Sequence, residues 1–192
     1  MVETQLKINN LKKIEEILLN FKPNELLKMR CTEPVIKKIP KIRVISKRTK
    51  GTYAETIPAL IGDLMNQISS KENQEQFVKI TGPIMYICHD IEYKEKDADI
   101  EVAVPISGRI TIQSEDIEVK NLPEETVLSI VYTGPYDEIG MGYQKIFEHT
   151  IKDNYKLKGA ARELYLNDPN ETTPENYLTE IQQLIIENNN FR

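Results

Sequence analysis

Runs of β-branched and apolar residues alternate along the chain with segments whose apolar residues recur every three or four positions. The runs 42–47 and 127–132 are each followed by a glycine, as strands that end in turns commonly are. After each glycine, helical spacing begins and continues over residues 57–68 and 139–151. Further apolar runs predict strands over residues 84–89, 100–105, 161–167 and 177–185. Strands interspersed with two helices in this way indicate an α+β fold.

Two segments lie outside this alternation. Residues 107–119 alternate apolar and polar positions, which predicts an added strand or hairpin. Near the amino terminus, apolar residues at helical spacing predict an amphipathic helix that ends at Pro23; they are Leu11, Ile14, Ile17, Leu18 and Phe21. We therefore divide the chain into a helical extension, residues 1–34, and a domain, residues 35–192.

The domain is an internal duplication. Residues 35–68 align without a gap on residues 118–151. The identical pairs are Lys37/Lys120, Pro40/Pro123, Val44/Val127, Ser46/Ser129, Gly51/Gly134, Tyr53/Tyr136, Glu55/Glu138 and Ile68/Ile151. After a shorter loop in the second copy the match resumes at Tyr86/Tyr165, Glu101/Glu180 and Ile106/Ile185. We infer repeat 1 at about 35–106 and repeat 2 at about 118–186. Each is a β-α-β-β unit, and together they predict a largely antiparallel sheet with two helices on one face and a central groove.

Composition narrows the function. The chain is 40% hydrophobic and 29% charged, with a mean hydropathy of −0.45 and no apolar run long enough for a membrane span. The amino terminus lacks the apolar core of a secretory signal, so we expect a cytoplasmic protein. A net charge of −5 argues against direct DNA binding. The local exception is the basic stretch Lys37–Lys50, which we interpret as a solvated strand face; the alternative is a docking patch for an acidic partner.

Metal and disulfide chemistry find no support. Cys31 and Cys88 are far apart, and His89 and His149 do not stand at the spacing of zinc ligands. We expect neither a metal nor a cofactor. Two glycines, Gly140 and Gly142, weaken the second helix, so a close neighbour or a bound ligand should require their small size.

Candidate binding residues come from the alternation in the strand over 161–167. If Leu164 and Leu166 pack under the second helix, then Glu163, Tyr165 and Asn167 point to the opposite face. The equivalent strand of repeat 1 sends Ile84, Tyr86 and Cys88 the same way. A two-fold duplication would bring these faces together, with Glu163 among tyrosines that include Tyr132. The structural alternative is a solvated or ion-paired glutamate beside half-buried packing tyrosines.

Three motifs carry a resemblance to a known family. They are Leu122-Pro123 followed by Thr133-Gly134-Pro135-Tyr136, then residues 162–169 (RELYLNDP), then Leu178-Thr179-Glu180. In this order they resemble the gyrase-inhibitor-like effector-binding domains, which also form the ligand-sensing parts of AraC-type and MerR-type multidrug regulators. The resemblance covers about residues 35–186. It implies an eight-stranded sheet with a central groove, ligands that are often aromatic, lipophilic and cationic, and a buried glutamate at the position of Glu163. Unlike some members, this chain has no tryptophan.

We therefore expect a stand-alone binder of lipophilic, aromatic or cationic small molecules, with no catalytic residue. The predicted ligand-binding residues are Glu163, Tyr165, Tyr86, Tyr132, Asn167 and Tyr143. Two alternatives remain open. The first is a hydrolase of strained electrophilic molecules in which Glu163 assists water. The second is a protein-interaction module, either a gyrase inhibitor or the partner of a regulator.

Overall fold

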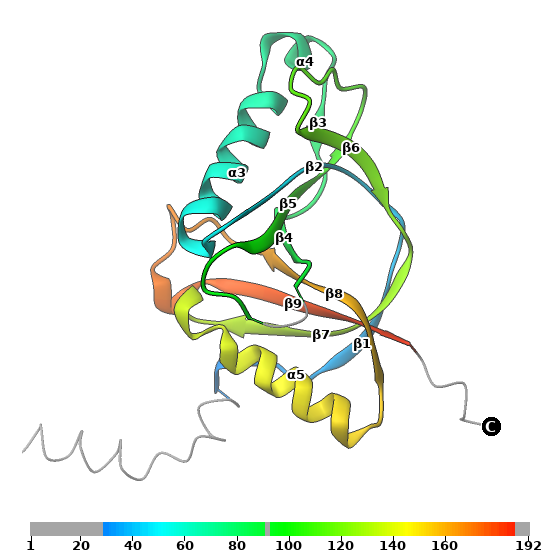
Figure 1. Ribbon diagram of the computed structural model, residues 1–192, viewed down its shortest axis with the longest axis vertical. Helices are drawn as coiled ribbons and strands as arrows, with labels where there is room; N and C mark the ends of the chain where they lie inside the picture. Colours follow the sequence, from blue (N-terminus) through cyan, green and yellow to red (C-terminus); the bar gives the residue numbers. More distant parts are fainter. Residues whose placement is uncertain (1–28, 91–92, 187–192) are drawn as a thin grey trace, which may run out of the picture.

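One curled antiparallel sheet of nine strands organises the molecule (Figure 1). The computed structural model describes residues 29–90 and 93–186, so the helix predicted before Pro23 lies outside the described residues. The strands follow the order β1-β7-β9-β8-β4-β5-β2-β6, and β3 pairs with β5. Their bounds are β1 Val35–Ile39, β2 Ile42–Gly51, β3 Lys79–Ile80, β4 Met85–Cys88, β5 Ala98–Ser107, β6 Ile117–Leu122, β7 Glu125–Thr133, β8 Lys156–Tyr165 and β9 Leu178–Ile186.

Three α-helices with both ends in the described residues accompany the sheet. Helix α3, Tyr53–Ile68, packs on β2 and β5, and α5, Gly140–Lys152, packs on β7 and β9 (Figure 1). The short α4, Lys71–Glu75, follows α3, and single 3-10 turns stand at Tyr136–Glu138 and Pro174–Asn176. No helix in these described segments is long and apolar enough to cross a membrane. The predicted α+β class, the antiparallel sheet and the two principal helices are confirmed.

The two halves of the sheet exchange their leading strands. β1 of repeat 1 pairs with β7 of repeat 2, and β6, its counterpart in repeat 2, pairs with β2 of repeat 1. The halves meet in the middle, where β4 pairs with β8. In this central pair Tyr86 lies opposite Glu163, and the amide of Tyr165 donates to the carbonyl of Ile84 at 3.0 Å. The centre of the sheet therefore brings together equivalent strands from both repeats.

Both faces of the sheet are covered. Facing α3 is one core cluster, which includes Ile45, Leu64 and Val102, and facing α5 is a second, which includes Leu128, Ile130 and Ile181. A third cluster lies on the opposite face, inside the curl; its buried members are Val44, Met85, Ile87, Ala103 and Leu122. Because the inner face buries apolar side chains too, alternation alone does not reveal which face of a strand meets a helix.

The predicted orientation of β8 is wrong for this reason. Leu164 packs inside the curl beside Met85 and Ile87, not under the second helix. Glu163 instead faces the helices, where it contacts Tyr143 of α5. Leu166 lies beyond the end of β8 and is 41% exposed. The prediction that Glu163, Tyr165 and Tyr86 share one face holds, but it is the helix face.

Several basic side chains of the stretch Lys37–Lys50 contact groups of the same chain. Lys37 pairs with Glu180, and Lys47 with Asp63 and Asp116. Arg48 forms two hydrogen bonds with Asp99, at 2.6 and 2.7 Å. These contacts fit the interpretation of a solvated strand face.

Candidate functional site

Glu163 lies at the centre of the sheet, under the side chains of helix α5. It is 8% exposed, stands opposite Tyr86 of β4 on one side and Ile181 of β9 on the other, and accepts a hydrogen bond from the Tyr143 hydroxyl at 2.7 Å. Burial disfavours the charged carboxylate and raises the pKa of Glu163 to about 7, although the Tyr143 hydrogen bond opposes the shift. At neutral pH this group therefore stands near the midpoint of its titration.

Two pairs of tyrosine rings related by the duplication flank Glu163. In repeat 1 the ring of Tyr53 meets Tyr86 edge to face, with centroids 5.9 Å apart. In repeat 2 the ring of Tyr136 meets Tyr165 in the same way at 5.4 Å. A further tyrosine stacks on each outer ring: Tyr93 on Tyr53, and Tyr177 on Tyr136. Offset and edge-to-face pairs of this kind form stable apolar walls.

The charge of Glu163 affects the pKa values of the nearby tyrosines. Burial and the nearby Glu163 charge both raise the pKa of Tyr143 and the pKa of Tyr165. Burial, Tyr177 and Glu163 raise the pKa of Tyr136 to about 12. At neutral pH all three phenols therefore keep their protons and offer neutral rings and hydroxyl donors to whatever lies beside Glu163.

Three of the six predicted binding residues surround Glu163, and two lie elsewhere. Tyr86, Tyr143 and Tyr165 are close to the carboxylate, whereas Tyr132 lies on β7, two strands from β8. Tyr132 is fully buried in the core under α5, and its hydroxyl donates to the Pro135 carbonyl at 3.2 Å.

Asn167 has a local role beyond the end of β8. Its amide donates to the Asn176 carbonyl and accepts from the Leu178 amide, each at 2.9 Å, which closes the connection from β8 to β9. Tyr136, whose ring packs on Tyr165, was not among the predicted residues, although its identity with Tyr53 across the repeats was a usable signal. Thr179 was missed too. It stands between Tyr132 and Tyr165 in the sheet, and its buried hydroxyl oxygen has no hydrogen-bond partner.

A hollow of about 490 Å³ opens beside α5. It is lined by Gly140, Tyr143, Gln144, Ile146, Phe147 and Thr150 of α5, Leu157 of β8 and Gln183 of β9. Tyr143 connects the hollow to the carboxylate, because it lines the hollow and its hydroxyl donates a hydrogen bond to Glu163. The volume lies within the range of small-molecule sites, about 300–1,000 Å³.

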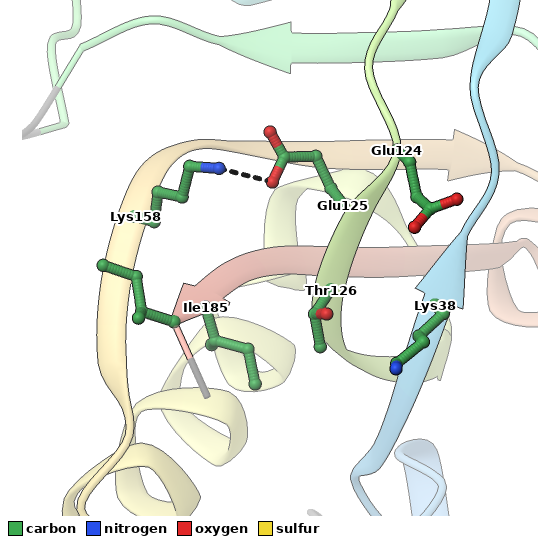
Figure 2. A pocket seen from close by; sticks show the side chains of 7 residues that line it. Lys38, Glu124, Glu125, Thr126, Lys158 and Ile185 are labelled. Atoms are coloured by element: carbon green, nitrogen blue, oxygen red, sulfur yellow. Dashed lines mark hydrogen bonds and ion pairs between the residues drawn. The ribbon is translucent and has the colours of Figure 1, made fainter. Parts of the chain in front are cut away.

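A second hollow, of about 270 Å³, differs in character (Figure 2). Lys38, Glu124, Glu125, Thr126, Lys158, Ile185 and Ile186 line it. Glu125 is already paired with Lys158 at 2.6 Å, as the dashed line in Figure 2 marks. No aromatic ring is among its lining residues, so the hollow beside α5 is the better candidate for a small-molecule site.

Two other glutamates of the sheet, the buried Glu101 and the half-buried Glu180, have cationic partners. Inside the curl, Glu101 contacts Lys120 at 2.6 Å and His89 at 2.7 Å, which lower the pKa of Glu101 to about 2 although burial opposes this. Glu180, its repeat equivalent, pairs with Lys37 at 2.9 Å, and its pKa is also lowered. Within the described part of the chain, no lysine, arginine or histidine lies at ion-pair distance from Glu163.

The ion pair between Lys120 and the buried Glu101 gives a stability prediction. Lys120→Met should lower the free energy of unfolding at pH 7 by about 2 kcal/mol or more, because it leaves the buried Glu101 carboxylate with only part of its compensation. Urea unfolding measures the loss, with Lys96→Met at an exposed site as the control. A change below about 0.5 kcal/mol would show that Lys120 adds nothing to the neutralisation by His89.

Close packing explains one of the two helix glycines, Gly142. A Cβ at this position would lie 2.5 Å from Cδ1 of the buried Ile181 and 3.3 Å from Cδ1 of Ile130, so its small size lets α5 approach the sheet. At Gly140, by contrast, a Cβ would meet no atom within 4 Å. Close packing therefore accounts for Gly142 but not for Gly140, which faces the hollow.

A second prediction follows from the close approach of α5 to the sheet at Gly142. Gly142→Val should lower the free energy of unfolding by about 1–3 kcal/mol, because the added methyl groups overpack a buried contact. Thermal or urea unfolding checks this result. Gly140→Val places the same side chain in open space and serves as the control, and equal stability of the two variants would contradict the packing argument.

The curled sheet, the paired helices and the tyrosine-lined carboxylate beside a hollow define a small-molecule-binding domain. A family model for the GyrI-like small molecule binding domain matches residues 32–185, so the chain belongs to this family. The resemblance noted in the sequence is thereby confirmed.

Solved structures share the fold. The crystal structure of the EcmrR C-terminal domain matches with a TM-score of 0.70 at 23% identity, over 81% of this chain and 98% of that chain. The cryo-EM structure of an EcmrR–DNA complex matches with a TM-score of 0.72 at 22% identity, over 97% of this chain and 70% of that chain. A hydrolase encoded by lin2189 from Listeria innocua matches with a TM-score of 0.59 at 12% identity, over 84% and 96%. No curated protein matches the sequence.

Proposed function

We propose that the chain binds lipophilic aromatic cations, whose charge is compensated by Glu163. The observation that carries the proposal is the unpaired state of this carboxylate. It is as buried as a core residue, yet among the residues that the structure describes it has no cationic partner, whereas Glu101 and Glu180 each have one. A buried carboxylate without a counter-ion is costly, and a cationic ligand removes that cost.

The surrounding rings favour the same class of ligand. Tyrosine faces attract a cation by about 0.5–2 kcal/mol each, depending on how far it is desolvated. Flat apolar walls with a single charge select for shape class and charge and impose no unique set of hydrogen bonds. In the proposed complex the Tyr143 side chain turns away from Glu163, and the ligand enters from the hollow that Tyr143 lines.

A pair of probes with the same three-ring body tests the role of charge. Crystal violet is a permanent cation, and its leuco form is neutral at pH 8. Followed by calorimetry at that pH, crystal violet should bind at least ten times more tightly than the leuco form. Equal affinities, or binding of neither compound, would refute the proposal.

A second candidate function rests on the pairing of Glu163 with the Tyr143 hydroxyl. A carboxyl group with a pKa of about 7 can accept a proton from water, and a neighbouring phenol can donate one to a leaving oxygen. This arrangement would suit hydrolysis of a strained cyclic ether: water adds to a ring carbon as the bond from that carbon to the ring oxygen breaks, Glu163 takes the water proton and Tyr143 protonates the ring oxygen. The proton then returns from Glu163 to Tyr143 through their hydrogen bond. Incubation with styrene oxide and detection of the diol separates the two functions, because a pure binder gives the uncatalysed rate.

A further inference from the structure

The two repeats differ in the residues that line the hollow. The alignment of residues 35–68 on 118–151 places Gly140, Tyr143, Gln144 and Phe147 over Ile57, Leu60, Ile61 and Leu64. All four residues of repeat 1 belong to or pack against the core cluster under α3, where Leu60 and Leu64 are buried. Gln183 of the hollow likewise corresponds to Val104, which is fully buried in that cluster. In repeat 1, apolar side chains therefore fill the space that is open in repeat 2.

A chain segment also closes repeat 1 from outside. Ile110 and Ile112 pack against the cluster under α3. Between them the Thr111 carbonyl accepts hydrogen bonds from Gln67 and Asn73, each at 3.0 Å. In repeat 2 the hollow leaves Phe147 56% exposed and Leu157 47% exposed. The duplicated fold therefore carries one packed half and one open half.

The unpaired carboxylate, like the hollow, is present in only one of the two repeats. Glu163 of repeat 2 corresponds to Ile84 of repeat 1, and its partner Tyr143 corresponds to Leu60. Both the unpaired carboxylate and the open space thus belong to repeat 2, and they meet at Tyr143. A ligand that places a positive charge at Glu163 therefore has room for its apolar part on the α5 side.

We propose that the hollow between α5 and β8 receives the bulky aromatic body of the cation, and that the missing side chain at Gly140 sets the size it accepts. This inference rests on the proposed role of Glu163. A Cβ at Gly140, the first residue of α5, would meet open space, so packing gives no reason for glycine at this position. Space for a ligand in the hollow that Gly140 lines does give one.

Gly140→Ile tests the inference by installing the residue that repeat 1 carries at Ile57. The new side chain fits without a clash and fills the hollow, so the variant should fold at least as stably as the wild type. Gly62→Ile is the matched control, because Gly62 is an exposed glycine of α3 whose Cβ would also meet no atom within 4 Å and which lies outside the hollow. Unfolding of both variants is measured first.

The readout is the ratio of two affinities, for the three-ringed crystal violet and for the compact tetraethylammonium ion, each from tyrosine fluorescence titration at pH 8. Gly140→Ile should lower this ratio at least tenfold, and Gly62→Ile should leave it within twofold of the wild type. An unchanged ratio in Gly140→Ile, with or without a uniform loss of affinity, overturns the size-selecting role. Failure of the proposed function shows differently: the wild type then binds neither cation, or Glu163→Gln binds both as the wild type does.

Discussion

Glu163→Gln should abolish the preference for cations and at the same time make the protein more stable above pH 7. Glutamine has the shape of the carboxylic acid and can still accept the Tyr143 hydrogen bond, but it cannot carry charge. Removing one partner of a desolvated charge pair typically costs about 2–5 kcal/mol of binding free energy. The affinity for crystal violet should therefore fall at least about thirtyfold at pH 8, while that for its neutral leuco form changes little.

The gain in stability follows from the raised pKa of Glu163. Between the ordinary value of 4.5 and about 7 the folded protein holds a proton that the unfolded chain has lost. The stability of the wild type therefore falls as the pH rises through this window, by about 3 kcal/mol in all, and the penalty is complete above pH 7. Glu163→Gln should escape it, so that the variant exceeds the wild type at pH 8 and matches it near pH 4.5.

Urea unfolding at the two pH values measures this difference. Glu171→Gln removes one charge at an exposed position and is the control, with little expected change at either pH. A folded Glu163→Gln protein that keeps its affinity for crystal violet would refute the binding role. A stability difference that is the same at pH 4.5 and pH 8 would refute the buried, partly protonated state of Glu163.

Cation binding below pH 7 should release close to one proton. At pH 6 a group with a pKa near 7 is roughly 90% protonated, and the bound cation requires the charged carboxylate. The affinity for crystal violet should accordingly rise about tenfold per pH unit between pH 5 and pH 7 and level off above it. Titration calorimetry at pH 6 in buffers of different ionisation enthalpy counts the protons. A count near zero in the wild type, or an unchanged count in Glu163→Gln, would contradict the linkage.

The sequence predicted the strands and helices of the fold better than it predicted which strands pair with each other. The β-branched runs and the helical spacing located β2, β5, β7, β9, α3 and α5, because those patterns report local burial. Pairing is not local. The exchange of β1 and β6 between the halves was not predicted, since a strand pattern carries no information about which strand lies beside it.

The candidate site was located in part. Duplication correctly placed Tyr86 and Tyr165 beside Glu163, because equivalent strands meet at the centre of the sheet. Tyr132 was misplaced because its distance from Glu163 depends on β9 lying between β7 and β8, an order that the chain does not encode locally. The open space at Gly140 could not be derived either, since a helix glycine is equally consistent with close packing, as Gly142 shows.

Because each repeat lends its first strand to the other, neither repeat is a self-sufficient module. A fragment that ends before β6 would lack the strand that borders β2, and a fragment that begins after β1 would leave the edge of β7 unpaired. The molecule should melt in a single cooperative transition, with no folded half as an intermediate. Present-day repeats of this fold are therefore interdependent, and expression of either one alone should give an aggregating chain and not a miniature of the whole.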